Sequence, residues 1–441
     1  MVGWRSLAAL PPLALLLVME VVRCVPVLVC YWRGLFFFAR GGSYTNCPVL
    51  RKDQHAKAHL YSMVLTFYLW DEPHYRAGTY KEDLRDNLKN VAVPGTGLPM
   101  SFWVRAKPLG YLFCFITNPI LCFCIAVLRC GLEWEQWRAF HEEFLQLLLH
   151  PTDWFTLWRM NCSLATFHSS LLNVPGYRME NKWVFLKAGG ESGIPVTPWH
   201  PVRSLAISRS QPTSLYHPTQ QFEGVTHGGD WIIQERVTNS PFLKQFLPSD
   251  APLSTFRIVT GWELQDSSDS EGQEPQENSV DRVIPFCCVL RAGLSRAETD
   301  HVSILFDVDM ETGEVRQGTT NNHWYRVGLS QVGQRPWTSY HNVTSHPDSK
   351  KAVTGRVVED IDKMVQLCRT AHAQLLPKVP MAGWDVAQTD DGSLNLLEVN
   401  LSCNFFRGAV DLPRYFAFLD RYFAFLSVRY QFARTAHAAR N

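Results

Sequence analysis

The chain has 441 residues, of which 46% are hydrophobic and 19% charged, and its formal net charge at pH 7 is +1. This length accommodates two or three domains with their own hydrophobic cores. A nearly neutral chain without a dense basic run lacks the electrostatic footprint of a nucleic-acid-binding protein, so we expect no nucleic-acid partner. The 12 cysteines include no Cys-x-x-Cys pair with zinc spacing, which disfavours a structural zinc site.

The first forty residues carry a pattern that indicates membrane targeting. An apolar run extends from Ser6 to Met19, and apolar residues predominate again from Cys24 to Phe38. A charge at the centre of a bilayer costs about 2.5–3.5 kcal/mol, so Glu20 and Arg23 disfavour a single span centred on them. Residues 1–40 therefore fit a signal peptide, a signal anchor or a transmembrane segment, and the sequence leaves these three open.

A second apolar segment, Leu109–Leu128, contains no charged residue. A helix of this length spans about 30 Å, the thickness of the hydrocarbon core of a bilayer, so the segment predicts a transmembrane helix. Asn118-Pro119 lies in its middle and would kink or break that helix, and a buried hairpin of two short helices is the alternative. Within residues 41–150, which we expect to be helical, further helices are predicted at Lys81–Leu88 and Glu133–His150.

A soluble domain is predicted to begin near Pro151, because no further apolar run of membrane length follows that residue. Within this domain, which comprises residues 151–441, residues 265–281 are acidic, rich in serine and almost free of apolar side chains. Such a segment cannot bury enough apolar surface to offset the entropy lost on ordering. We therefore expect a disordered surface loop there.

The stretch from Gly383 to Asn400 is the most informative part of the chain. It predicts a β-hairpin, because two apolar strands flank an Asp-Gly turn. Asp385 lies on the first strand, and Glu398 and Asn400, two positions apart on the second strand, point to the same face. Two carboxylates and an amide oxygen on one face form the all-oxygen set that Mg²⁺ prefers. The alternative is a solvated hairpin face with polar residues at alternate positions.

Three stretches upstream carry residues that suit nucleotide binding. Trp183–Leu186 predicts a strand, which is followed by Lys187 and a glycine-rich turn at Gly189–Gly193. Backbone N–H groups of such a turn can approach phosphate oxygens, although a plain turn between two strands fits the same residues. Trp231–Val237 predicts a second strand that ends in polar residues, and Thr255–Thr260 predicts a third strand with one arginine inside it.

In this order the pieces resemble the ATP-grasp superfamily. The interval Asp385–Glu398 and the Glu-x-Asn ending are similar to the metal-binding hairpin of D-alanine–D-alanine ligases. The stretch Gln234–Thr260, together with Arg291–Gly293 and Val308–Gly313, resembles the sugar-transfer-associated ATP-grasp branch. The resemblance covers Trp154–Arg429. It implies an α+β ATP-grasp fold, in which two α+β subdomains clamp a nucleotide, preceded by a membrane-associated helical region.

The resemblance also implies a role for each matching residue. The catalytic residues would be Arg257, which neutralises the γ-phosphate, and Lys187, which contacts the α- and β-phosphates of ATP. One or two Mg²⁺ ions would be held by Asp385, Glu398 and Asn400. The other nucleotide contacts would come from Gly189, Gly190, Ser192 and Gly193 in a flexible loop over the phosphates, from Glu235 at the ribose, and from Gln234, Arg236 and Val237 in the adenine linker.

Enzymes of this kind join a carboxylate to an amine or a similar nucleophile through an acyl phosphate. We therefore expect an ATP- and Mg²⁺-dependent ligase acting on a small-molecule or glycan carboxylate, with a link to glycan or cell-surface polymer modification that rests on the branch resemblance alone. Two departures keep other functions open: Arg159 stands where the family has a lysine, and the bulky stretch Leu401–Phe406 follows the Glu-x-Asn ending. The alternatives are an inactive nucleotide-binding scaffold or sensor, and a kinase acting on a sugar or lipid head group.

A domain that uses ATP is expected to face the cytosol, so the sequence predicts a membrane-associated protein with its ATP-grasp domain in the cytosol. Two tripeptides, Asn161-Cys162-Ser163 and Asn342-Val343-Thr344, match the acceptor pattern for N-glycosylation. Glycosylation of either asparagine would place the domain in a lumenal or extracellular compartment instead.

Overall fold

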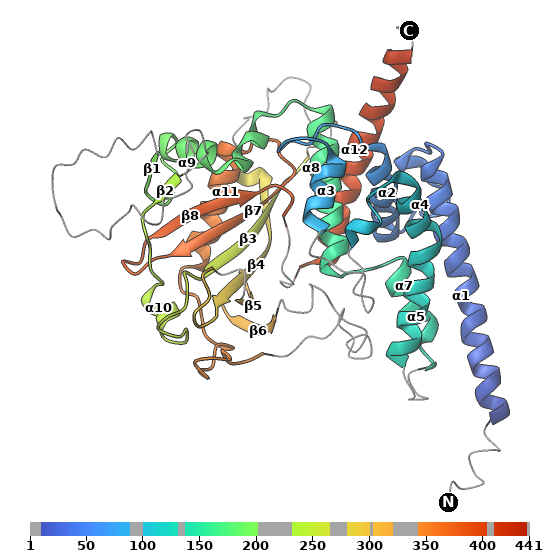
Figure 1. The fold of residues 1–441 in the computed structure, drawn as a ribbon, viewed down its shortest axis with the longest axis horizontal. Coiled ribbons are helices and arrows are strands. Elements are labelled where there is room, and N and C mark those ends of the chain that lie inside the picture. Colours follow the sequence, from blue (N-terminus) through green and yellow to red (C-terminus); the bar gives the residue numbers. More distant parts are fainter. Residues whose placement is uncertain are drawn as a thin grey trace, which may run out of the picture.

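The computed structural model shows an α+β protein with a six-stranded antiparallel sheet on one side and a cluster of helices on the other (Figure 1). The α+β class expected from the sequence is confirmed. The residues that the structure describes are 10–88, 100–130, 137–201, 232–264, 280–299, 303–320, 343–403 and 410–438.

The large sheet has the strand order β6-β5-β4-β3-β7-β8, and every neighbouring pair is antiparallel. Its last two strands form the predicted hairpin, in which Gly392 turns with φ +81°. Only glycine adopts this backbone conformation without strain, which explains the Asp-Gly turn. The six strands are β3 (Thr255–Trp262), β4 (Val283–Gly293), β5 (Ser303–Val308), β6 (Val315–Thr320), β7 (Met381–Gln388) and β8 (Leu394–Asn400).

A smaller two-stranded sheet and two short helices accompany the large sheet. Strands β1 (Trp199–Pro201) and β2 (Ile232–Gln234) pair antiparallel. The strand predicted at Trp231–Val237 is therefore present, although shorter than expected. Helix α9 (Lys182–Glu191) lies close to these strands, whereas helix α10 (Pro241–Lys244) lies toward the opposite end of the large sheet (Figure 1).

Both faces of the large sheet are covered by helices. On one face Phe256 and Ile258 of β3 pack in the same core as Met364 of helix α11 (Ile361–Leu375). On the other face Val259 belongs to the core that contains residues of helix α12 (Leu412–Ala438). Every residue of β3 and of β7 is buried, as expected for central strands between two layers.

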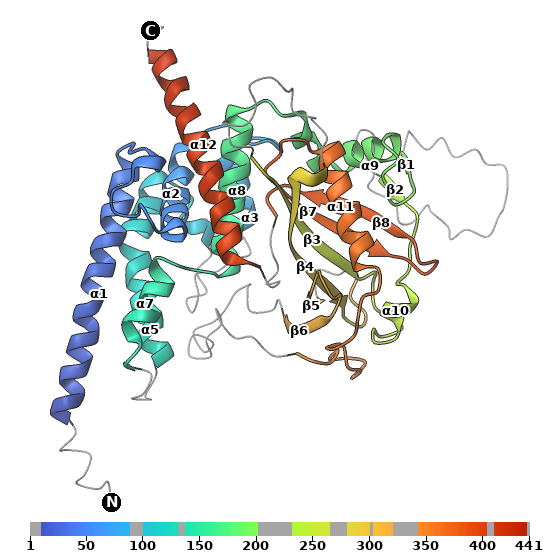
Figure 2. The ribbon, with the colours of Figure 1, turned by 180° about the vertical axis from the view of Figure 1, so that it is seen from behind.

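The helical cluster contains residues from both ends of the chain. Helix α12 packs against helices α2 and α8, which also pack against each other (Figure 2). The sequence placed α8 and α12 after the boundary at residue 151, and the structure shows that they share a core with helices before it. The other helices of the cluster are α1 (Leu10–Ala39), α2 (Gln54–Tyr68), α3 (Tyr80–Leu88), α4 (Lys107–Leu112), α5 (Asn118–Cys130), α7 (Phe140–Leu148) and α8 (Trp154–Leu171).

Short turns of other helix types connect these elements. A π-helical segment joins α4 to α5, so the chain runs helically through Asn118-Pro119 instead of breaking there. The segments concerned are the 3₁₀ turns Tyr44–Asn46, Met100–Phe102, Pro175–Glu180 and Val280–Arg282 and the π turn Phe113–Thr117.

Within the described residues, two helical stretches are long and apolar enough to cross a membrane. They are Val18–Ala39, with 22 residues and a mean hydropathy of 1.6, and Lys107–Cys130, with 24 residues and a mean hydropathy of 2.2. Apart from Val357 and Val428, the exposed large hydrophobic side chains of the described residues all lie on these two stretches. The predicted apolar segments are thus helices with an apolar outer face.

The two apolar stretches contact each other and carry few charges. The indole nitrogen of Trp32 donates a hydrogen bond of 2.9 Å to the carbonyl oxygen of Phe115. Glu20, whose charge disfavoured a span at this point, is 1% exposed. Its carboxylate lies 2.5 Å from Nη1 of Arg23 and 2.8 Å from Nδ1 of His141 in α7. The charge of Glu20 is therefore paired, and its contact with His141 links α1 to α7.

Several expectations fall partly outside the described residues. The predicted helix Lys81–Leu88 is present as α3, and of the predicted helix Glu133–His150 the structure describes residues 137–150, of which Phe140–Leu148 form α7. Residues 265–279 of the predicted acidic loop and residues 404–406 of the bulky stretch lie outside the described residues.

Candidate functional site

Three neighbouring strands place charged side chains in one row across the sheet. Arg257 of β3 is in register with Asp385 of β7, which is in register with Glu398 of β8. Residues directly opposite each other in antiparallel strands project to the same face of the sheet. The row lies on the face that also carries Val259, at which the sheet packs toward α12.

Asp385 and Arg257 form a buried, bidentate ion pair. Nε of Arg257 lies 2.5 Å from Oδ1 of Asp385, and Nη2 lies 2.8 Å from Oδ2. The two side chains are 5% and 4% exposed. Arg291 of β4 approaches the same carboxylate, with Nη1 at 3.4 Å from Oδ2. Asp385 therefore has two cationic neighbours, whereas the sequence predicted only a metal ligand at this position.

The two carboxylates of the row have opposite pKa shifts. Burial alone would raise the pKa of Asp385, and the charges of Arg257 and Arg291 lower it below its ordinary value. The pKa of Glu398 is raised, first by burial and then by the charge of Asp385. Neighbouring carboxylates share one proton more readily than they carry two charges. Glu398 therefore takes up a proton more readily than Asp385, whose charge is offset by the two arginines.

Asn400 completes the predicted oxygen set. Its Nδ2 donates a hydrogen bond of 3.3 Å to Oε1 of Glu398, so the two side chains lie on one face as expected. Asp385, Glu398 and Asn400 are thus brought together by the β7–β8 hairpin. A divalent cation suits this set, because it would replace the shared proton and neutralise both carboxylates with the oxygen ligands that Mg²⁺ requires.

A cavity of about 1050 Å³ reaches strand β8, which carries Glu398 and Asn400, although the residues of the row do not themselves line it. Its wall includes Gln234, Arg236 and Val237 of the predicted adenine linker and Glu235, predicted at the ribose, together with Lys182, Lys244 and Lys351. Leu397 also lines the cavity and directly precedes Glu398 on β8, so the cavity and the row meet on this strand. Its volume is at the upper end of the range of small-molecule sites, about 300–1,000 Å³.

Two buried polar atoms in the wall of the cavity have no hydrogen-bond partner among the described residues. They are Nε2 of Gln234 and Oγ1 of Thr197. An unsatisfied buried polar group costs about 1–3 kcal/mol, so a ligand with polar groups would gain by binding them. The wall also contains Glu235, Asp250 and Glu298, which makes the cavity mixed in charge rather than uniformly basic.

The strand predicted at Trp183–Leu186 and the glycine-rich loop predicted after it are wrong, because these residues form helix α9. Asn181 caps the N-terminus of this helix by accepting two backbone N–H groups. Phe185 and Gly189, four positions apart, are both buried, which is helical spacing. A cap before an apolar run was the signal that distinguishes this helix from a strand.

The position of Lys187 removes it from the candidate site. Its side chain is 57% exposed, and its Nζ lies 3.9 Å from the carboxylate of Glu191 on the same helix. Gly190 lies on this helix, Ser192 caps its C-terminus, and Gly193 follows with φ +70°. None of these residues lines the cavity next to the row.

Arg159 also lies away from the candidate site, although the resemblance to the ATP-grasp superfamily places it where the family has a lysine. It lies on α8 in the helical cluster, where its guanidinium is 2.9 Å from Oγ of Ser62 and 2.9 Å from Nδ1 of His59. It does not line the cavity next to the row. Since Arg159 belongs to the helical cluster, it does not stand in for the nucleotide-binding lysine that the resemblance implies.

The acceptor tripeptide at Asn161 is inaccessible to glycosylation in the folded protein. Asn161 is 1% exposed, donates 2.9 Å to the carbonyl oxygen of Cys403 and accepts 2.6 Å from the hydroxyl of Tyr415. The second tripeptide begins at Asn342, which lies outside the described residues. The described part of the chain therefore offers no glycosylation argument for a lumenal domain.

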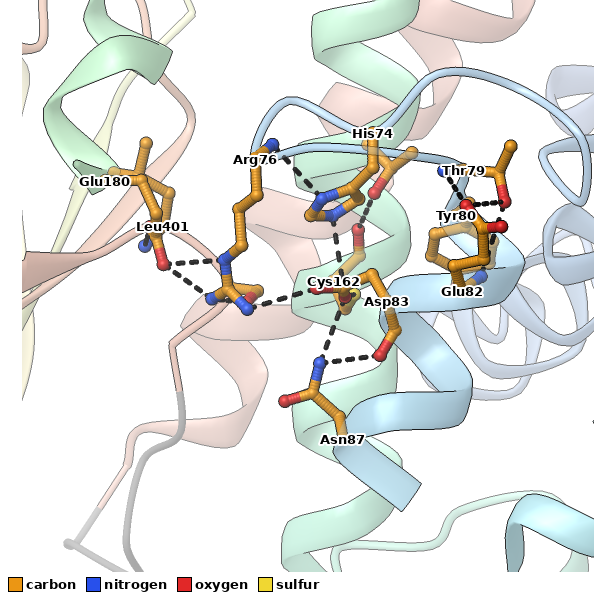
Figure 3. A network of polar contacts seen from close by, with 12 residues as sticks. His74, Arg76, Thr79, Tyr80, Glu82, Asp83, Asn87, Cys162, Glu180 and Leu401 are labelled. Atoms are coloured by element: carbon orange, nitrogen blue, oxygen red, sulfur yellow. Dashed lines mark hydrogen bonds and ion pairs between the residues drawn. The ribbon is translucent and has the colours of Figure 1, made fainter. Parts of the chain in front are cut away.

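A polar network that no sequence pattern indicated joins the helical cluster to the end of β8 (Figure 3). Arg76 donates to Glu180 at 2.8 Å, to Asp83 at 3.2 Å and to Ser402 at 2.8 Å. Glu180 accepts the backbone N–H of Leu401 at 2.7 Å. Because Leu401 and Ser402 directly follow the Glu-x-Asn ending, the network holds the end of the strand that carries two of the candidate metal ligands.

No protein-family model, curated protein sequence or solved structure matches this chain. The case for a function therefore rests on the chain's own residues and geometry. Three features carry it: the row of Arg257, Asp385, Glu398 and Asn400, the cavity beside it, and the unsatisfied polar atoms in the cavity wall.

Proposed function

We propose that this chain is an ATP-grasp enzyme, a Mg²⁺- and ATP-dependent ligase that joins a carboxylate to an amine or a similar nucleophile. The observation that carries the proposal is the row of Arg257, Asp385, Glu398 and Asn400, which shares strand β8 with a cavity walled by Gln234–Val237 and Leu397. Phosphoryl transfer depends on positioning and charge neutralisation more than on covalent help from the protein. The arginines, carboxylates and amide of the row can supply both positioning and charge neutralisation.

The nucleotide base and ribose would occupy the cavity. Gln234, with its unsatisfied Nε2, would hydrogen-bond the base, and Glu235 would bind the ribose hydroxyl groups. The lysines of the wall, Lys182, Lys244 and Lys351, take the phosphate-neutralising role that the sequence assigned to Lys187. The phosphates would extend toward Glu398, which is next to the cavity-lining Leu397.

Asp385, Glu398 and Asn400 would hold Mg²⁺, which neutralises phosphate oxygens and orients the terminal phosphate. In the ligand-free protein the charge of Asp385 is taken up by Arg257. Once a cation shares that carboxylate, Arg257 can turn part of its hydrogen bonding to the γ-phosphate. Binding of the cation and binding of the nucleotide would therefore depend on each other.

The proposed reaction has two steps. A carboxylate oxygen of the substrate attacks the γ-phosphorus, the bond to the β–γ bridging oxygen breaks, and ADP leaves. The amine then attacks the acyl carbon of the acyl phosphate, orthophosphate leaves and the amine nitrogen gives up a proton. Arg257 and Arg291 would stabilise the charge on the transferring phosphoryl group. A glycan carboxylate as substrate rests on the branch resemblance alone.

The test uses the full-length protein in detergent with Mg²⁺, ATP labelled in the γ-phosphate, a pool of carboxylates, and hydroxylamine as the nucleophile. A ligase releases labelled orthophosphate and forms a hydroxamate in equal amounts. Glu398→Gln abolishes both products, and Asp390→Asn, at an exposed carboxylate in the turn of the same hairpin, leaves them unchanged. Label transferred to an acceptor would make the protein a kinase, and no ADP formation with any carboxylate would exclude a ligase.

One observation favours a second function, a scaffold or sensor that binds ATP without turnover. Arg257 and Asp385 satisfy each other's charge in a buried site, so the cavity can be filled while this pair stays intact. Such a protein would be stabilised by ATP in the absence of Mg²⁺, and Glu398→Gln would not change that stabilisation. The ligase proposal requires instead that stabilisation by ATP depends on Mg²⁺ and that Glu398→Gln removes it.

We also propose that the two apolar helical stretches tether the chain to a membrane, with the sheet in the cytosol. The support is their length, their apolar outer face and their contact through Trp32 and Phe115. Asp391→Asn creates an Asn-Gly-Ser acceptor in the exposed hairpin turn. Expressed in eukaryotic cells, this variant should resist extraction at alkaline pH and stay unglycosylated. Glycosylation of the new acceptor would place the sheet in the lumen.

A further inference from the structure

We propose a transition-metal site formed by His74, Asp83 and Cys162, which takes Zn²⁺ or a similar borderline-soft divalent ion (Figure 3). One ligand atom from each side chain lies within 4.8 Å of the other two. His74 precedes α3, Asp83 lies on α3 and Cys162 on α8, so the site would join two helices and a loop of the helical cluster. It is separate from the proposed ligase site and does not depend on that function.

The spacing of the three donors suits tetrahedral coordination. Nε2 of His74 lies 3.6 Å from Oδ2 of Asp83, and Sγ of Cys162 lies 4.0 Å from the same oxygen. With Zn–N and Zn–O bonds of about 2.1 Å and a Zn–S bond of about 2.3 Å, tetrahedral geometry separates N from O by about 3.4 Å and S from O by about 3.6 Å. The donor atoms of His74 and Cys162 lie within 4.8 Å of each other, so the three side chains must rotate toward one another to bind a metal ion.

His74 supplies an independent sign that a ligand is expected there. Its side chain is fully buried, and its Nε2 has no hydrogen-bond partner among the described residues. Nδ1 accepts the backbone N–H of Arg76 at 3.2 Å, which places the proton of the neutral ring on Nε2. Metal binding at Nε2 would move the ring proton to Nδ1, so the 3.2 Å hydrogen bond from the backbone N–H of Arg76 would break and the new Nδ1–H would need an acceptor of its own. A buried nitrogen directed at a carboxylate and a thiol is then satisfied.

The charges around the cluster leave one oxygen of Asp83 for the metal. Oδ1 of Asp83 is 3.2 Å from Nη1 of Arg76, and the charge of Arg76 is in turn offset by Glu180. Oδ2 faces His74 and also accepts 3.1 Å from Nδ2 of Asn87, which is exposed. A water entering from the side of Asn87 would complete four-coordination, as in zinc sites with three protein ligands.

The donor set distinguishes this site from the all-oxygen site at Asp385. Thiolate and imidazole select zinc or cobalt over magnesium, whereas carboxylate and amide oxygens select magnesium. No sequence pattern indicates the site, since its three ligands do not follow the short spacing of a structural zinc motif. Through Arg76 and Glu180 the site would also tie the helical cluster to Leu401 at the end of β8.

The test is a Co²⁺ titration of the full-length protein in detergent after treatment with a chelator. We expect one tightly bound Co²⁺ per chain, with a thiolate-to-cobalt charge-transfer band and intense ligand-field bands of tetrahedral cobalt. Added Zn²⁺ should displace Co²⁺ and abolish the charge-transfer and ligand-field bands. It should also raise the melting temperature, and a chelator should reverse that rise. Cys162→Ser, which changes one atom, should remove the charge-transfer band, and His74→Ala should weaken Co²⁺ binding at least tenfold.

The matched control is Cys368→Ser, at an equally buried cysteine in α11, which should leave the cobalt spectrum unchanged. The wild-type titration decides the matter even if a variant fails to fold. Saturating Co²⁺ without a charge-transfer band, or a band that survives Cys162→Ser in a folded protein, would overturn the site. A band lost in Cys368→Ser would place the metal elsewhere.

Discussion

Arg257 and Asp385 face each other on strands β3 and β7 and share two hydrogen bonds, of 2.5 Å and 2.8 Å, in the buried centre of the sheet. The pair accounts for the position of both residues in the ligand-free protein. It also sets a condition for the proposed ligase, in which a metal ion would need Asp385 and a phosphate would need Arg257. The proposed ligase can therefore work only if its ligands replace the contacts of the pair.

Replacing Asp385 should destabilise the whole protein. Asp385→Asn leaves Arg257 and Arg291 buried without a counter-charge, and the loss of one partner from such a pair lowers the free energy of unfolding by about 3–5 kcal/mol. Denaturant unfolding at neutral pH measures it. Lys363→Gln, which breaks the exposed ion pair with Asp360, should have no measurable effect. An equally stable Asp385→Asn protein would show that the pair is not formed.

Gly190 in α9 and Gly193, which follows the helix, distinguish a helix from a phosphate-binding loop. A Cβ at Gly190 meets nothing within 4 Å, so Gly190→Ala should raise the free energy of unfolding by about 0.5–1 kcal/mol, as in a helix interior. Gly193→Ala should lower it by about 1 kcal/mol, since φ is +70° there. Gly190→Ala should also respond to ATP and Mg²⁺ as the wild type does. Weaker stabilisation of that variant by ATP and Mg²⁺ would instead support the phosphate-binding loop predicted from the sequence.

Stability should fall as the pH is lowered from neutrality. Burial lowers the pKa of His372 to about 4, and the neutral ring bonds Oγ1 of Thr260 at 2.7 Å and the carbonyl oxygen of Val379 at 2.9 Å. The unfolded chain takes up this proton below about pH 6.5, and the folded chain does not until about pH 4. The free energy of unfolding should therefore decrease by up to about 1.4 kcal/mol per pH unit across this window.

Two other histidines, His168, which is buried, and His55, which is partly buried, act in the same direction. Burial lowers the pKa of His55 to about 4 and that of His168 to about 3. Unfolding measured at pH 7, 6 and 5 should show the decline, and His372→Gln should reduce its slope. A free energy of unfolding that stays constant from pH 7 to pH 5 would contradict the buried neutral state of these rings.

The network around Arg76 should couple the helical cluster to the sheet. Arg76→Met leaves Glu180 and Asp83 without their guanidinium partner and should lower the free energy of unfolding by about 1–3 kcal/mol. It should also weaken the stabilisation by ATP with Mg²⁺, because Leu401 is held through Glu180. Arg296→Met, at an arginine whose side chain is 91% exposed, is the matched control and should change neither quantity. Equal behaviour of the two variants would rule out the coupling.

Local signals in the sequence predicted the strands of the candidate site correctly. The Asp-Gly turn determines the β7–β8 hairpin, and alternation along β8 places Glu398 and Asn400 on one face. The same local view failed at α9, where a short apolar run before glycines was interpreted as a strand although Asn181 caps a helix. A short apolar run contains too few residues for its periodicity to distinguish a helix from a strand, so the N-cap residue is the more informative signal.

Contacts between distant segments had no local signal at all. The bidentate pair of Arg257 and Asp385 depends on the register of two strands that are far apart in the chain. The packing of α12 against α2 brings the two ends of the chain into one core, which a division by composition at residue 151 does not reveal. Such features depend on topology, which a single sequence specifies only through the complete fold.

The most direct test of the central claim is thermal unfolding of the full-length protein with ATP, with Mg²⁺ and with both. Ligand at about a hundred times its dissociation constant adds about 2.7 kcal/mol of stability, which corresponds to a shift of a few degrees in a protein of this size. We expect a shift that needs both ligands, persists in Asp390→Asn and is lost in Glu398→Gln. No shift at saturating ATP with Mg²⁺, or an equal shift in Glu398→Gln, would contradict a nucleotide and metal site at the row of Arg257, Asp385, Glu398 and Asn400.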